Sequence, residues 1–137
     1  MPNGFHGSRA QWERLEAPLR ALDGELETFS QRYGIALSRN QRNWPDRSLV
    51  WGAPVRRLIQ IYLADVERVT YDVWLCASED RGNKRYWKRR FLRERAQASD
   101  ISAEITELLE RGRALLESWD GEALEFATTL TPLGLIL

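Results

Sequence analysis

The chain has 137 residues, in which 20 Lys and Arg balance 20 Asp and Glu. This length suits one domain with one core, and the apolar share of 43% argues against disorder. Zero net charge favours no class of partner, and a single Cys excludes an internal disulfide framework. The start has no apolar stretch typical of a secretory signal, and no run approaches the roughly 20 apolar residues that cross a bilayer. We therefore expect a cytoplasmic protein without membrane contact.

The N-terminal part of the chain predicts a helix. Ser8 and Gln11 have the spacing of a capping box. Apolar residues then recur at alternating intervals of three and four, as on one helix face: Trp12, Leu15, Leu19, Leu22, Leu26, Phe29 and Tyr33. Pro18 should kink this helix or mark a restart, and Gly34 should end it. The stripe could form a dimer seam, which leaves room for a homodimer, but Pro18 favours packing on the protein's own sheet.

The middle of the chain predicts antiparallel strands. Short apolar or alternating runs lie at 35–37, 49–51, 57–63 and 68–78, with a loop at 38–47. In the last run Val73 and Leu75 share one face, while Asp72, Trp74 and Cys76 share the other, which is strand periodicity.

The sequence "EDRGN" that follows predicts a hairpin turn, because Gly82 and Asn83 tolerate positive φ. The returning strand is then 84–95. On a helix its aromatic residues would point in different directions, whereas on a strand Trp87 and Phe91 share one face. A second helix should begin at Ser99 or Asp100.

These elements predict an α+β fold, a two-layer sandwich with an N-terminal helix, an antiparallel sheet of about five strands and a C-terminal helix. Each helix has one apolar face, and a sheet covered on one side can bury both. We expect a flexible N-terminus at 1–7, a single α+β domain at 8–120, and a tail at 121–137 docked on that domain.

The charge is distributed unevenly along the chain. Residues 81–95 carry eight Lys or Arg and one acid, a net charge of +7. Residues 96–137 hold two Arg against eight acids, a net charge of −6. One interpretation is nucleic-acid binding, with phosphates on the cations of 84–95 and bases on its aromatic rings. The residues for this role are Arg85, Trp87, Lys88, Arg89, Arg90 and Arg93. The favoured interpretation is a strand edge whose charges partly pair with the acidic C-terminal helix, because the cations occupy both strand faces.

The polar side of the fourth run raises a second hypothesis. Trp74 lies there with Asp72, on a surface that either faces solvent or belongs to a minor second core. An exposed Trp would indicate a partner site, since Trp and Tyr are favoured interface anchors. The residues predicted to bind a protein partner are Trp74, Asp72, Tyr86, Lys88 and Arg90.

Residue types that carry catalysis are scarce. The only His, His6, lies in the predicted loose terminus, and one Cys with one His does not make an ordinary zinc site. We expect no catalytic residue, no metal and no cofactor, although the sequence leaves enzymatic activity open. The leading hypothesis is a non-enzymatic protein-binding module of adaptor, chaperone or inhibitor type. Nucleic-acid binding is the alternative, and a small-molecule pocket near Trp44 and Trp51, between helices and sheet, is a weaker one.

Overall fold

The computed structural model of this chain describes residues 7–126. Within that range the helices are α1 Arg9–Arg20, α2 Asp23–Tyr33 and α3 Ala98–Ser118, with short 3-10 helices η1 Gln41–Asn43 and η2 Gly121–Ala123. The strands are β1 Ala36–Arg39, β2 Asp46–Trp51, β3 Arg56–Asp65, β4 Thr70–Arg81, β5 Lys84–Ala96 and β6 Glu125–Phe126. Residues 1–6, which include His6, and 127–137 lie outside the described residues. Most of the expected N-terminal segment 1–7 and of the expected tail 121–137 is therefore not described.

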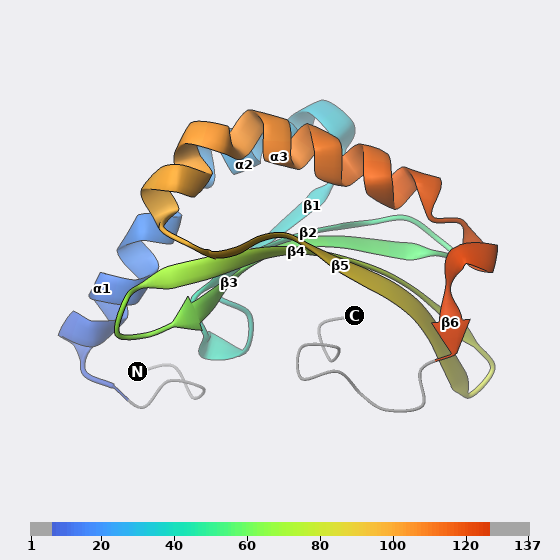
Figure 1. The fold of residues 1–137 in the computed structure, drawn as a ribbon, viewed down its shortest axis with the longest axis horizontal. Coiled ribbons are helices and arrows are strands. Elements are labelled where there is room, and N and C mark those ends of the chain that lie inside the picture. Colours follow the sequence, from blue (N-terminus) through green and yellow to red (C-terminus); the bar gives the residue numbers. More distant parts are fainter. Residues whose placement is uncertain (1–6, 127–137) are drawn as a thin grey trace.

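The six strands form one antiparallel sheet in sequence order, β1-β2-β3-β4-β5-β6. The α-helices lie on one side of it, with α3 running across the sheet (Figure 1). We call that side the helix face and the other the open face. The predicted α+β architecture is confirmed, and β6 adds a short strand to the five that were expected.

The N-terminal helix is two helices. The predicted capping box at Ser8 starts α1, which ends at Arg20, and α2 begins at Asp23. Pro18 lies inside α1 and has no N–H to donate to the preceding turn, and α1 ends two residues later at Arg20. Asp23 and Glu25 then favour a new start, because acidic side chains stabilise the first turn of a helix.

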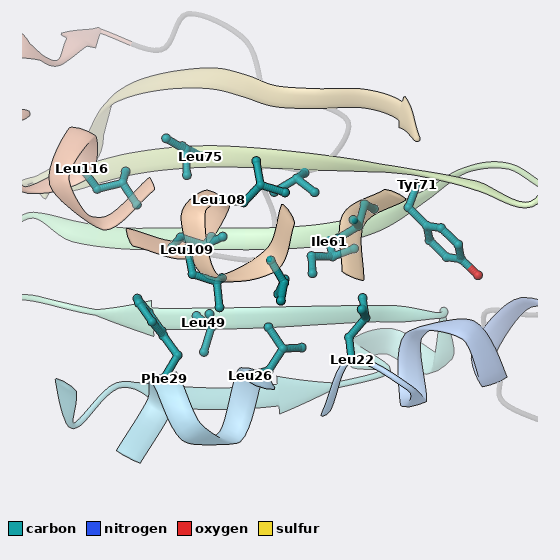
Figure 2. Close-up of a cluster of buried hydrophobic side chains, with 14 of the residues drawn as sticks. Leu22, Leu26, Phe29, Leu49, Ile61, Tyr71, Leu75, Leu108, Leu109 and Leu116 are labelled. Carbon is teal, nitrogen blue, oxygen red and sulfur yellow. The ribbon is translucent and has the colours of Figure 1, made fainter. Parts of the chain in front are cut away.

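The main core lies between the helices and the sheet (Figure 2). Leu22, Leu26 and Phe29 from the N-terminal helices meet Leu49 and Ile61 from the strands, and all are buried. The apolar stripe of the first two helices is therefore covered by the protein's own sheet and by α3. It provides no free seam for a coiled-coil dimer.

Arg47 connects β2 with both N-terminal helices. Its side chain is 1% exposed, and it donates from Nε to Asp23 at 2.6 Å and from one terminal nitrogen to Glu16 at 2.6 Å. The other terminal nitrogen donates to the Asn40 side chain at 2.9 Å and to the Asp46 carbonyl at 2.8 Å. A further bond to Asp23 Oδ2, at 3.2 Å, gives all five N–H groups an acceptor. These bonds offset the cost of burying the guanidinium.

The acids around Arg47 are themselves paired. Glu16 also accepts from Arg20 at 2.7 Å, and Asp23 lies 3.2 Å from Arg39. Burial alone would raise the pKa of Glu16, but the hydrogen bonds from Arg47 and Arg20 outweigh it and hold that pKa below the ordinary value of 4.5. The folded protein therefore favours the ionised form of Glu16.

This shift predicts a pH-dependent contribution to stability. An acid whose pKa is lowered by folding stabilises the protein above its unfolded pKa, and the contribution is lost as the pH falls through the folded pKa. We expect Glu16→Gln to lower the free energy of unfolding at pH 7 by about 2 kcal/mol, as for a hydrogen bond to a charged group. The deficit should shrink as the pH falls below 4.5. Urea unfolding over a pH series measures it.

Glu13→Gln is the matched control, because Glu13 is an exposed carboxylate of α1 that pairs only with Arg20 among the described residues. It should change stability by no more than about 0.5 kcal/mol. A Glu16→Gln deficit that is the same at pH 7 and pH 3 would contradict the assignment.

Candidate functional site: the basic strand β5

β5 is the strand that the sequence predicted over 84–95. A two-residue turn with Gly82 at φ +68° joins it to β4, so that Arg81 pairs with Lys84. On its outer side β6 pairs only with Tyr86 and Trp87. Beyond Trp87, no strand among residues 7–126 pairs with this side of β5. We call the stretch Lys88–Phe91 the β5 edge.

The side chains of β5 divide between the two faces of the sheet, because residues paired across strands share a face. The open-face pairs are Arg85 with Asp80, Trp87 with Ser78, Arg89 with Cys76 and Phe91 with Trp74. The helix-face pairs are Tyr86 with Glu79, Lys88 with Ala77, Arg90 with Leu75 and Arg93 with Val73.

Both predicted binding sets are therefore split. Of the protein-binding set, Trp74 and Asp72 lie on the open face, whereas Tyr86, Lys88 and Arg90 lie on the helix face. The nucleic-acid set divides in the same way. Arg85, Trp87 and Arg89 lie on the open face, and Lys88, Arg90 and Arg93 lie on the helix face. Neither set forms a one-sided surface, and the residues that the two sets share, Lys88 and Arg90, lie at the β5 edge.

Trp74 is buried, at 1% exposure, so it does not offer an open aromatic anchor. Its ring stacks on Phe91, with centroids 6.1 Å apart and planes inclined at 29°. Leu58 and Cys76 on the same face are also buried. These residues form a second, smaller packed layer, and Phe91, 43% exposed, is its accessible member.

A chain of hydrogen bonds holds Trp74 in place. An indole N–H can only donate, and it donates to Gln60 Oε1 at 2.6 Å. This fixes the orientation of the amide, whose nitrogen donates to Asp46 Oδ2 at 3.0 Å. The second oxygen of Asp46 accepts from the Gln41 backbone at 2.9 Å. Burial raises the pKa of Asp46 above 3.8, although the bonds from Gln41 and Gln60 oppose the rise.

Sequence reasoning missed both Asp46 and Gln60. Asp46 falls in the stretch expected to be a loop, and nothing local distinguishes it from an exposed turn residue. Gln60 gave a usable signal, since it interrupts the apolar run at 57–63. A polar residue at the centre of a buried strand needs a partner on a neighbouring strand.

Cys76 and Asp72, which share a face of β4 with Trp74, are held by burial and by a backbone contact. Burial raises the pKa of Cys76 to about 12, although Arg89 and Arg85 lower it slightly, so the thiol is protonated at neutral pH. Asp72 accepts from the Arg95 backbone N–H at 2.9 Å, where the register between β4 and β5 shifts. In the described part of the chain, no group of three His, Cys, Asp or Glu side chains could hold a metal ion.

The charges of β5 are only partly neutralised within the fold. Arg85 pairs with Asp80 at 2.8 Å, and Arg93 pairs with Glu104 of α3 at 3.1 Å. Lys88 lies over the Trp119 ring, 5.2 Å from its centroid. Arg90 is exposed and takes part in no ion pair among residues 7–126. The edge therefore keeps positive charge beside the exposed ring of Phe91.

A hollow of about 430 Å³ lies at the start of β6, beside β5. It is lined by Trp87, Lys88, Arg89, Ala123 and Glu125. A small-molecule pocket near Trp44 and Trp51 stays a prediction, and the two rings make different contacts. Trp51 donates to Glu117 of α3 at 2.7 Å on the helix face, whereas Trp44 stacks with Tyr62, which is paired with Asp46 and Asp72.

In comparisons with protein-family models, curated proteins and solved structures, nothing matched this chain. No helix of the described residues is long and apolar enough to cross a membrane. The functional interpretation therefore depends on the geometry of β5 and its surroundings.

The hydrogen bond of Trp74 leads to a stability prediction. Trp74→Phe keeps an aromatic ring under Phe91 but leaves the buried oxygen of Gln60 without a donor. We expect it to lower the free energy of unfolding by about 1–3 kcal/mol beyond the effect of ring size. Trp51→Phe is the matched control, because its N–H donates to an exposed acid. Urea unfolding of both variants checks this, and equal losses would contradict it.

Proposed function

We propose that this chain is a small non-enzymatic protein-binding module, of adaptor, chaperone or inhibitor type, that acts without a cofactor. The observation that carries the proposal is the exposed ring of Phe91, which stacks on the buried Trp74. Arg89 lies on the same face of β5 and Arg90 on the opposite face. Aromatic residues and Arg are enriched in protein interfaces, where a few of them supply most of the binding energy.

The base of Phe91 makes it a suitable anchor. Its ring stacks on Trp74, which the bond to Gln60 fixes in one position. A partner that covers Phe91 therefore meets a ring that is already ordered, which avoids much of the entropy cost of binding. Its exposed share can be buried without moving the strand.

Nucleic-acid binding is the second candidate, and one observation favours it. Arg85, Trp87, Arg89 and Phe91 alternate cations and aromatic rings along the open face, as on surfaces that bind single strands. Protein binding is the better supported of the two. Arg85 is already paired with Asp80, and Lys88 and Arg90 lie on the face that such a strand would not reach.

A cytoplasmic location belongs to the same proposal. The single cysteine, Cys76, is a buried free thiol, which suits a reducing compartment. Its raised pKa also keeps it from reacting while the protein is folded.

Capture of partners from the native host with the full-length chain tests the proposal. We expect a protein that binds the wild type to be lost with Phe91→Ala and weakened with Arg90→Glu. Arg68→Glu is the control, since Arg68 is an exposed cation in the turn between β3 and β4 and makes the same charge change. With a purified partner, Phe91→Ala should weaken binding about tenfold or more, as expected of an interface anchor.

Capture should be repeated after nuclease treatment, together with a mobility shift using oligo-deoxythymidine at low salt. A partner that disappears with nuclease, or oligonucleotide binding that Arg89→Glu abolishes and Arg90→Glu spares, would favour the nucleic-acid candidate. A partner that binds the wild type, Phe91→Ala and Arg90→Glu alike would contradict the role of β5.

A further inference from the structure

We propose that the β5 edge binds an acidic segment of a protein partner in extended conformation, added to the sheet as a further strand beside Lys88–Phe91. This inference rests on the proposed protein-binding function and names the chemistry of the partner. Three features of β5 support it: the direction of its backbone groups, the distribution of its cations, and the pairing of β6 with the same side of the strand.

The backbone of the β5 edge has groups available for a new strand. In a two-residue hairpin the flanking residues exchange hydrogen bonds, and pairs then alternate along the ladder. Counting from the pair Arg81 and Lys84, the N–H and C=O of Arg89 and Phe91 are expected to face away from β4. The pairing with β4 is regular up to Phe91, where the first register shift begins. The outer side of this stretch has no strand partner in the described structure.

The cations favour a peptide strand over a phosphate backbone. The side chains of an added strand alternate between the faces of the sheet. An acidic segment would therefore place carboxylates near Arg89 on the open face and near Lys88 and Arg90 on the helix face. A polynucleotide lying on one face would meet only half of these charges.

β6 places one acidic residue, Glu125, on this side of β5. Glu125 pairs with Trp87 and lines the hollow together with Lys88 and Arg89. That pairing ends at the point where the proposed binding stretch begins. The hollow leaves room beside Trp87 for the first side chain of an incoming segment.

The same charges disfavour a second copy of the chain at this position. Lys and Arg on an edge strand repel an identical edge, which is how many proteins prevent association of their sheets. An acidic segment turns this repulsion into attraction. Charge therefore decides which strands can pair here.

Two substitutions at one residue separate backbone pairing from charge. Arg89→Ala and Arg89→Pro remove the same charge, but only proline also removes the N–H expected to face outward. Proline is tolerated on edge strands at such positions. The probe is a terminally blocked peptide, Glu-Val-Glu-Glu-Val-Glu-Glu-Val-Glu, which presents carboxylates on both faces of a strand. Affinity is measured by calorimetry at low and at physiological salt.

We expect the wild type to bind the peptide, Arg89→Ala to bind it a few-fold more weakly, and Arg89→Pro to bind about tenfold or more weakly than Arg89→Ala. The same peptide with alternate backbone nitrogens methylated, which keeps every charge, should bind poorly. No binding to the wild type overturns the proposal, as does equal binding to the two variants or equal binding of the two peptides.

Hydrogen exchange of the wild type keeps the test valid if Arg89→Pro does not fold. Exchange of the Arg89 and Phe91 amides should slow by about tenfold or more on adding the peptide, and unchanged exchange overturns the proposal. A captured protein partner that requires Phe91 but binds Arg89→Pro and Arg89→Ala equally would overturn the strand-addition mode alone and leave the proposed function standing. Binding of oligo-deoxythymidine without binding of the peptide would overturn both.

Discussion

The enclosure of Arg47 by five acceptors is the constraint on which the arrangement of this molecule depends. Glu16 and Asp23 bring α1 and α2 onto β2, and they do so on one side of the sheet only. Because side chains alternate along a strand, Arg47 on the helix face puts Asp46 on the open face. Asp46 then accepts a hydrogen bond from Gln60 on the neighbouring strand β3, and Gln60 accepts one from Trp74 on β4. A buried ion cluster on the helix face is thus linked through β2 to a chain of contacts on the open face that ends at Phe91, which stacks on Trp74.

Periodicity predicted most of the sheet because its information is local. The alternation in 68–78, the turn at Gly82 and the shared face of Trp87 and Phe91 all lie within a few residues of one another, and the structure has them in β4 and β5. The stretch 38–47 was expected to be a loop, yet β2 begins at Asp46. Buried polar residues become favourable only with their partners, and the acidic partners of Arg47 lie on helices far away in sequence.

The candidate site was less predictable for the same reason. Residue types alone placed Trp74 and Arg90 in one surface, whereas the pairing register puts them on opposite faces. The buried N–H of Trp74 needs the acceptor that Gln60 supplies from β3. No pattern within a single strand indicates this pairing. Phe91 was visible in the alternation beside Trp87, but no pattern within β5 indicates that β6 pairs only with Tyr86 and Trp87 and does not extend beside Phe91.

Irregular backbone limits what β5 can bind. The register with β4 shifts near Leu92 and again near Arg95, where Asp72 holds the backbone N–H and Arg95 has φ +50°. Such bulges bend a strand and end regular pairing. Only a short stretch of the edge then remains straight, and each backbone hydrogen bond contributes about 1 kcal/mol or less after exchange with water. Backbone bonds alone would give weak and unselective pairing. The cations on both faces and the ring of Phe91 must supply the rest, so binding at this edge should be reversible and sensitive to salt.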